Sequence, residues 1–341
     1  MEKITSPLYM APSTFSSSSS SSSKSLHLSR SPARGRRGGT KVVQEAKHEP
    51  MAIVGQLVRN IFNSDLREKA LLELSKKTET VEDLALLLWH SRGIISELLR
   101  EIVEIYPALS SPNLMQAASN RVCYALTLFQ CVASHPETRT LFVNACIPQY
   151  LYPFLQTVDK SKPFEYLRLA TLAVIGALVK DKDAEVINFL LGSGVISLCF
   201  NIMEIGDELS KTAATFIVEK VLLEDVGLDY FCETPKRFFD MGWALANMVE
   251  SLTDRPSTKL LKHIISCYLR LTEIPSANAR GTLHGFIPPV LRDRTFDNCL
   301  KDEPETRQRL KRLLEIVPKD NGPEKLSDLV AAAIRHKRRS I

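Results

Sequence analysis

Glycine is scarce in this 341-residue sequence, and the usual phosphate-binding and metal-binding patterns are missing. Its 14 glycines form no GxGxxG, GxxxxGKS or GxxxxGKT segment, so a glycine-rich phosphate-binding loop is excluded. The seven histidines form no HExxH pair, the spacing that places two zinc ligands on one helix face. We therefore expect no metal, no cofactor and no enzymatic activity.

The cysteines do not form a disulfide framework, because they are odd in number and widely spaced. No CxxC pair occurs among Cys123, Cys131, Cys146, Cys199, Cys232, Cys267 and Cys299. Two of them, Cys123 and Cys131, lie eight residues apart on one expected helix, where buried packing is favoured over a reactive or metal-binding pair. The pattern favours buried thiols in a reducing compartment.

Long hydrophobic runs are also missing. A membrane-spanning helix needs roughly 18–20 apolar residues, and the most apolar stretch, 167–179, contains Arg168 and is followed by Lys180. No membrane partner is therefore expected. No segment alternates between apolar and polar residues as a half-buried strand does. The composition, 44% hydrophobic and 24% charged, is ordinary for a globular protein.

The net charge of +5 is unevenly distributed. Residues 1–44 carry a net charge of +6 and residues 301–341 carry +4, which leaves −5 for residues 45–300. A folded surface that grips nucleic acid is expected to be strongly basic. The acidic central part argues against such a surface.

Both ends of the chain differ from the centre in composition. Residues 1–49 include an unbroken serine run, Ser16–Ser23, and an Arg/Gly-rich stretch, which predicts a disordered leader. An organellar transit peptide and a short nucleic-acid tether are alternatives for this segment. Residues 318–341 form a basic tail with one short helix at most. Its RHKRR stretch, Arg335–Arg339, has the composition of a nuclear-import patch, a phosphate contact or a solvated tail.

From about residue 50 the apolar residues recur with helical spacing. Ile95, Leu98, Leu99, Ile102 and Ile105 form one stripe, and Pro107 ends that helix. Asp65 with Glu68, and Ser134 with Glu137, have the spacing of helix N-terminal capping pairs. These signals predict an all-α fold over residues 50–317.

One helical phrase recurs along the chain. Residues 140–151 and 189–199 share an apolar run, a short break and a second apolar run, with Ile147 and Val195 separated by 48 residues. A weaker third copy runs from Leu228–Phe231 to Phe238 and Phe239. A period near 40–47 residues is typical of armadillo/HEAT repeats. The sequence therefore predicts a right-handed helical solenoid whose concave groove binds proteins.

Other polar and aromatic residues have structural explanations. His135 precedes Pro136 at a helix start, where capping is expected, and the carboxylates of Asp181, Asp183 and Glu185 compensate a helix dipole. The two tryptophans, Trp89 and Trp243, are expected in the core or in a groove wall.

Several long phrases resemble the Required-for-Cell-Differentiation-one-like family. They are Ala70–Lys77, Ser119–Phe142, Pro163–Lys180, Glu185–Leu191, Glu208–Leu223 and Leu260–Leu271, and the likeness spans about residues 55–317. The resemblance implies an armadillo-type, non-catalytic subunit (subunit nine) of the carbon-catabolite-repression–Not (CCR-NOT) deadenylase complex. Such a subunit docks on the Not scaffold and binds peptides of RNA-binding or silencing factors. It thereby promotes mRNA deadenylation, decay and translational repression in the cytoplasm, including P-bodies, and in the nucleus.

The resemblance also assigns candidate site residues. Scaffold binding falls on His90, Arg92, Ser96 and Val103, where Arg92 stands in place of a usual Phe and Ser96 in place of a usual Ala. Peptide binding falls on Tyr166, Ala173, Thr212, Ala213 and Arg237. Nucleic-acid contact in the groove, which some members show, would fall on Arg237 and Lys259. Self-association into a homodimer is a further property of some members.

Two alternatives remain open from the sequence. The first is a direct single-stranded nucleic-acid-binding module. The second is a divergent paralogue that has left the complex and is targeted to an organelle, such as the plastid, by the serine-rich leader.

Overall fold

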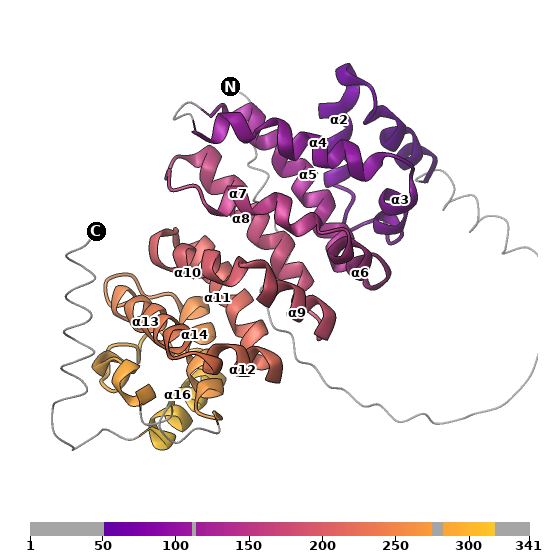
Figure 1. Ribbon diagram of the computed structural model, residues 1–341. Coiled ribbons are helices and arrows are strands. Elements are labelled where there is room, and N and C mark those ends of the chain that lie inside the picture. The colour runs from indigo at the N-terminus through magenta and orange to yellow at the C-terminus, as the bar shows by residue number, and fades with distance from the viewer. Residues whose placement is uncertain (1–50, 111–113, 275–281, 318–341) are drawn as a thin grey trace, which may run out of the picture. The chain divides into compact units, whose positions relative to one another are not determined.

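The described part of the chain is helical throughout. The computed structural model describes residues 51–110, 114–274 and 282–317 (Figure 1). The predicted leader, 1–49, and the predicted basic tail, 318–341, lie outside the described residues. No strand occurs in the described ranges, so the prediction of an all-α fold is confirmed. The chain divides into two compact units, one ending at Thr138 and the other beginning at Arg139.

The first unit packs three helices against one long central helix. A helix over 51–60 is followed by α2 (Ser64–Ser75), α3 (Leu84–His90), α4 (Ile94–Glu104), the 3-10 turn η2 (Tyr106–Ser110) and α5 (Gln116–Ser134). Helix α5 contacts α2, α3 and α4. Leu71, Leu88, Leu98 and Phe129 have no exposed surface. Each such side chain contributes about 1.5–3 kcal/mol by burial, and together they form the core of this unit.

The helix caps differ from those that the sequence predicts. Helix α2 is capped by Asn63, whose side chain accepts a hydrogen bond from the Asp65 backbone N–H at 2.9 Å, so Asp65 lies inside the first turn. The Ser134 hydroxyl donates to the Gln130 carbonyl instead of capping the next helix. His135 Nδ1 accepts from the Glu137 N–H at 3.3 Å and takes that role. The observed capping residues thus lie two positions before the predicted Asp65 and one position after the predicted Ser134.

The second unit consists of helices that range from about one turn to nearly five turns in length. Helix α6 (Pro136–Asn144) crosses the division between the units and leads to η3 (Ile147–Leu151), α7 (Tyr152–Leu155) and α8 (Lys162–Leu178). Next come α9 (Ala184–Ser193), α10 (Val195–Ile205), α11 (Glu208–Leu223), α12 (Asp225–Glu233), α13 (Pro235–Ser251) and α14 (Thr258–Leu271). The described chain ends with η4 (His284–Phe286), η5 (Pro289–Leu291) and α16 (Pro304–Ile316).

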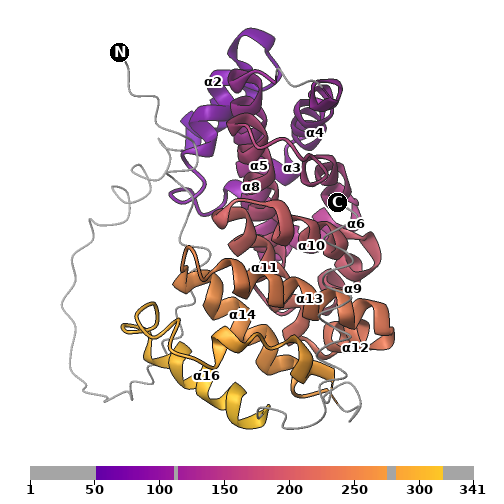
Figure 2. The ribbon, with the colours of Figure 1, turned by 90° about the vertical axis from the view of Figure 1, so that its left-hand side faces the viewer.

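Helix α11 lies between α8 and α14, and it contacts both (Figure 2). Helices α9 and α10 precede α11, and helices α12 and α13 precede α14. The two strongest copies of the repeated phrase also share a turn: Cys146 (φ 55) precedes Ile147, and Gly194 (φ 83) precedes Val195. Both residues are in the left-handed region that glycine adopts without strain. The 48-residue repeat in the sequence thus corresponds to a repeated backbone turn.

The turn at Gly194 bends the chain by 71° between α9 and α10. Among the described helices, none alone has the length and apolar character of a membrane span. This bent pair meets the criterion only when its two helices are taken together.

Ion pairs connect successive repeats of the second unit along one series of loops. Arg139 pairs with Asp181 at 2.5 Å, Lys182 with Glu224 at 3.6 Å, and Arg270 with Asp225 at 2.5 Å. Arg270 also donates to the Leu222 carbonyl at 3.2 Å. Asp183, by contrast, caps α9 by accepting from the backbone N–H groups of Glu185 and Val186. The acidic cluster of the sequence therefore divides between capping and inter-repeat pairing.

Three cysteines, Cys123, Cys199 and Cys267, are buried as expected, but Cys146 is exposed. Burial raises the pKa of Cys123 and of Cys199 to about 12. Because the thiolate is the nucleophile, these groups are almost wholly unreactive near pH 8. Cys146 owes its exposure to the left-handed turn before Ile147.

We predict that iodoacetamide near pH 8 alkylates Cys146 well before Cys123 or Cys199 in the folded protein, since their raised pKa and burial both reduce reactivity. Peptide mapping by mass spectrometry measures the order. In urea the difference should disappear. Equal rates for Cys123 and Cys146 in the folded protein would contradict the buried position of Cys123.

Gly227 permits a close approach between α12 and the end of α11. A Cβ atom there would lie 1.8 Å from the Val221 carbonyl oxygen, a backbone atom that has no room to move. Gly227→Ala should therefore lower the free energy of unfolding by about 3 kcal/mol or more. Urea denaturation followed by circular dichroism provides the measurement.

Gly192→Ala is the matched control for this substitution. No atom lies within 4 Å of a Cβ at Gly192, which lies within α9. Alanine should raise the free energy of unfolding there by up to about 0.5–1 kcal/mol. Equal destabilisation by both alanines would refute the steric explanation for Gly227.

Candidate functional site

The four residues assigned to scaffold binding are all exposed on α3, α4 and the turn between them. His90 ends α3, and Arg92 lies in the turn. Ser96 and Val103 lie two helical turns apart on the solvent side of α4, and Val103 is 40% exposed although it is apolar. We call the exposed side of His90, Arg92, Ser96 and Val103 the α3–α4 surface. Its exposure fits a contact surface, and its role stays a prediction.

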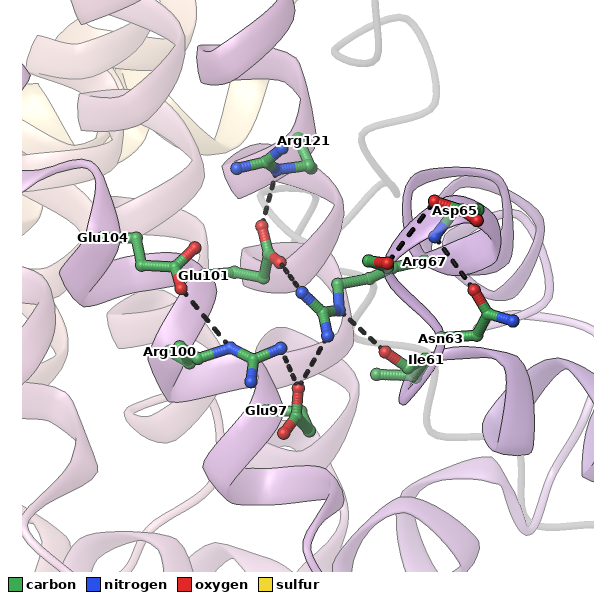
Figure 3. A network of polar contacts seen from close by, with 10 residues as sticks. Ile61, Asn63, Asp65, Arg67, Glu97, Arg100, Glu101, Glu104 and Arg121 are labelled. Carbon is green, nitrogen blue, oxygen red and sulfur yellow. Dashed lines mark hydrogen bonds and ion pairs between the residues drawn. The ribbon is translucent and has the colours of Figure 1, made fainter.

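The opposite side of α4 contains a buried carboxylate. Glu101 is 1% exposed and lies between two guanidinium groups (Figure 3). Arg121 Nε, from α5, lies 2.6 Å from Oε2, and Arg67 Nη1, from α2, lies 3.4 Å from Oε1. An isolated buried carboxylate is strongly unfavourable, so Glu101 depends on these two cations.

Arg67 extends this network to the start of α4 and to the chain before α2. Its Nη2 lies 3.2 Å from Glu97 Oε2, and its Nε donates to the Ile61 carbonyl at 2.7 Å (Figure 3). Glu97 also pairs with Arg100. The side chains thus connect α2, α4 and α5, and they fix the orientation of the helix that carries Ser96 and Val103.

The residues assigned to peptide binding lie at different depths in the second unit. Tyr166 and Ala173, both on α8, are half-buried. Thr212 and Ala213, on α11, are only 7% and 1% exposed, and the Thr212 hydroxyl donates to the Glu208 carbonyl. The sequence did not indicate this burial, because polar and small residues occur both in cores and on surfaces.

The Arg237 side chain, in the first turn of α13, is held by the preceding helix α12. Its guanidinium lies 3.9 Å from the ring centroid of Tyr230, forms an ion pair with Glu233 at 2.5 Å and donates to the Tyr230 carbonyl. Lys259, by contrast, is exposed on α14. Arg237 would have to give up these contacts to bind a phosphate, so the geometry does not favour a nucleic-acid site at this pair.

A cavity of about 360 Å³ lies among α10, α11 and α13. Phe200, Trp243 and Asn247 contribute to its wall, together with Lys211 and the Lys236–Asp240 ion pair at 2.6 Å. Desolvation lowers the pKa of Lys211, the half-buried cation of the wall. None of the predicted peptide-binding residues lines this cavity. Trp243 was expected in the core or in a groove wall, and it lies in the wall.

The described residues contain no group of three or more His, Cys, Asp or Glu side chains placed to hold a metal ion. In that part of the chain the buried polar side chains include the Glu101 ion pairs and hydroxyls that donate to backbone carbonyls, as Thr138 and Tyr268 do. The arrangement is suited to binding another macromolecule through exposed helix faces.

We predict that Glu101→Gln lowers the free energy of unfolding by about 3 kcal/mol, because Arg67 and Arg121 would lose a shared anion. The value lies at the low end for buried pairs because the Arg121 side chain is 39% exposed. Glu104→Gln is the control: Glu104 is 49% exposed and pairs only with Arg100 among the described residues, so its loss should cost less than about 1 kcal/mol. Chemical denaturation separates the two. Equal stabilities would show that Glu101 contributes nothing beyond a surface charge.

Comparison with known structures identifies the fold. A designed armadillo repeat protein in complex with a (KR)4 peptide matches 77% of this chain and 99% of its own length, with a TM-score of 0.56 at 14% identity. A second designed armadillo repeat protein matches the same share with a TM-score of 0.57 at 15% identity. At such identities the likeness shows the fold alone. The prediction of an armadillo-type solenoid is confirmed.

Comparison with known sequences identifies the family. The Schizosaccharomyces pombe protein named cell differentiation protein rcd1 is 53% identical over 272 residues, which cover 80% of this chain and 95% of that protein. The Saccharomyces cerevisiae protein CAF40 is 51% identical over 249 residues, which cover 73% of this chain and 66% of CAF40. The model of the cell differentiation family, Rcd1-like, matches residues 57–317. The chain therefore belongs to the Rcd1-like cell differentiation family.

Proposed function

We propose that this chain is a non-catalytic adaptor subunit of the CCR-NOT deadenylase complex. It docks on the Not scaffold through the α3–α4 surface and binds peptides of RNA-binding or silencing factors through the second unit. By bringing the deadenylase to selected messages it promotes their shortening, decay and translational repression. Its sites of action are the cytoplasm, including P-bodies, and the nucleus.

The observation that carries this proposal is that the α3–α4 surface is exposed while the opposite side of α4 is held by ion pairs to α2 and α5. Ser96 and Val103 face solvent, while Glu101 on the same helix is clamped by Arg67 and Arg121. A surface that is already ordered before binding loses little conformational entropy when a partner docks. This is what a stable subunit interface requires.

The sequence supports the same assignment. The chain shares long phrases with the family, and it belongs to the Rcd1-like family together with rcd1 and CAF40. The phrases lie mostly in α5, α8, α11 and α14, the helices that form the interior of the two units. The shared phrases therefore fall mainly on the helices whose packing holds the proposed surfaces in place.

The peptide-binding part of the proposal relies on α8 and on the cavity in the second unit. Tyr166 and Ala173 have accessible surface, whereas Thr212 and Ala213 shape a site only through their packing. The cavity offers Trp243 for apolar contact and Lys211 for an acidic group. These features suit a short peptide segment better than a folded surface.

We expect Val103→Glu to weaken binding of the purified Not scaffold subunit by about 10-fold or more, because it places a charge on an apolar contact surface. Isothermal titration calorimetry measures the dissociation constant. Leu141→Glu is the matched control, because Leu141 is 41% exposed against 40% for Val103 and lies on α6, which contributes no residue to the proposed surface. Equal weakening by both variants, or no scaffold binding by the native chain, would contradict the proposal.

A further inference from the structure

Phe62 is a large aromatic side chain left in solvent beside the proposed docking surface. It lies between the helix over 51–60 and α2, and it is 49% exposed although its neighbour Ile61 has no exposed surface. Exposed aromatic rings held in fixed positions are frequent binding anchors, since they bury a large area at little entropic cost.

The Phe62 ring is seated on the turn between α3 and α4. A Cβ atom on Gly93 would lie 3.2 Å from Cε1 and 3.4 Å from Cζ of the ring, so the ring rests on the glycine itself. Gly93 also has φ +82, a conformation that side-chain-bearing residues rarely adopt. Two separate features therefore favour glycine here, and the ring contact places Phe62 against the residue that follows Arg92 in the chain.

The backbone on both sides of Phe62 is fixed. The Ile61 carbonyl accepts a hydrogen bond from Arg67, which belongs to the Glu97–Glu101 network (Figure 3). The Asn63 side chain accepts from the Asp65 N–H and caps α2. The same side chains that orient α4 therefore also hold the segment that carries the ring.

The charge beside the ring is positive. Arg92 is exposed, and within the described ranges it has no ion-pair partner. Glu97, five residues after Arg92, pairs with Arg67 and Arg100, and Asp65, three residues after Phe62, accepts from the Ser64 hydroxyl. Asp83 lies at the opposite end of α3 from Arg92. An incoming group would meet an apolar ring beside an uncompensated cation.

We infer that Phe62 is the aromatic anchor of the α3–α4 surface, and that it receives a segment of the scaffold in which an apolar side chain adjoins a carboxylate. This inference rests on the proposed function and adds a residue and a partner chemistry to it. The basic leader of this chain is a poor occupant, because residues 1–44 carry a net charge of +6 and Arg92 would repel them.

The test compares exposed phenylalanines on the two units. Phe62→Ser should weaken binding of the purified Not scaffold subunit by about 10–30-fold in calorimetry. Phe239→Ser is the control, because Phe239 is 44% exposed and lies on α13 of the second unit, and it should leave the affinity within about 2-fold. Phe62→Leu keeps an apolar contact with Gly93, so it preserves the fold, and it should weaken binding by about 3–10-fold. Thermal melting verifies that each variant is folded.

The charge component has its own variant. Arg92→Glu should weaken scaffold binding by about 10-fold and make the affinity less sensitive to salt concentration. The affinity of Arg92→Lys should stay within about 3-fold of that of the native chain. Stronger binding by Arg92→Glu would overturn the acidic partner chemistry.

The outcomes distinguish this inference from the proposed function. If the native chain binds the scaffold, Val103→Glu does not, and both Phe62 variants bind as the native chain does, the inference fails while the proposed function stands. If the native chain does not bind the scaffold, both fail. If Phe62→Ser converts a dimer into a monomer in light scattering without changing scaffold affinity, the occupant is a second copy and the inference fails.

Discussion

The second unit depends on the burial of its central helix, α11, by the helices packed around it. Eleven of the sixteen residues of α11 are buried, including Thr212, Thr215 and Glu219, so this helix has almost no side to offer solvent. Helices α8, α10, α12 and α14 all contact it, and this packing buries it. Three of the polar side chains that this burial captures are paired: Thr212 and Thr215 donate to carbonyls one turn back, and Glu219 lies 2.6 Å from His263 of α14. Most of the surface that the second unit offers to partners therefore comes from the helices around α11.

Much of the fold was predictable because helical periodicity and repetition are local properties of a sequence. The 48-residue offset between Ile147 and Val195 indicated the repeat, and the structure places a left-handed residue before each. The capping residues were misplaced by one or two positions, since Asn63 and His135 compete with nearby Asp and Ser for the same N–H groups. Local pattern alone does not decide such competitions.

The candidate site was less predictable, because it depends on contacts between distant residues. A glutamate in a helical stripe suggests solvent, yet Glu101 is buried by Arg67, which lies 34 residues earlier, and by Arg121. The cavity beside Trp243 likewise requires three helices to be placed first. Phe62 is an apolar residue at a helix boundary, a position that gives no sequence signal of its exposure. The residues were visible in the sequence, but their surroundings were not.

The inter-repeat ion pairs of the second unit have a consequence for selectivity. Asp181 and Lys182 are adjacent but serve different pairs, and so are Glu224 and Asp225. In each pair a cation lies against an acid, so the opposite charges cancel one another at close range. These paired charges produce little net electric field at a distance, and they give a polyanion such as RNA no continuous row of cations to bind. Because these charges are compensated, we expect partners to bind the parts of the surface where a charged group has no ion-pair partner or an apolar side chain is exposed.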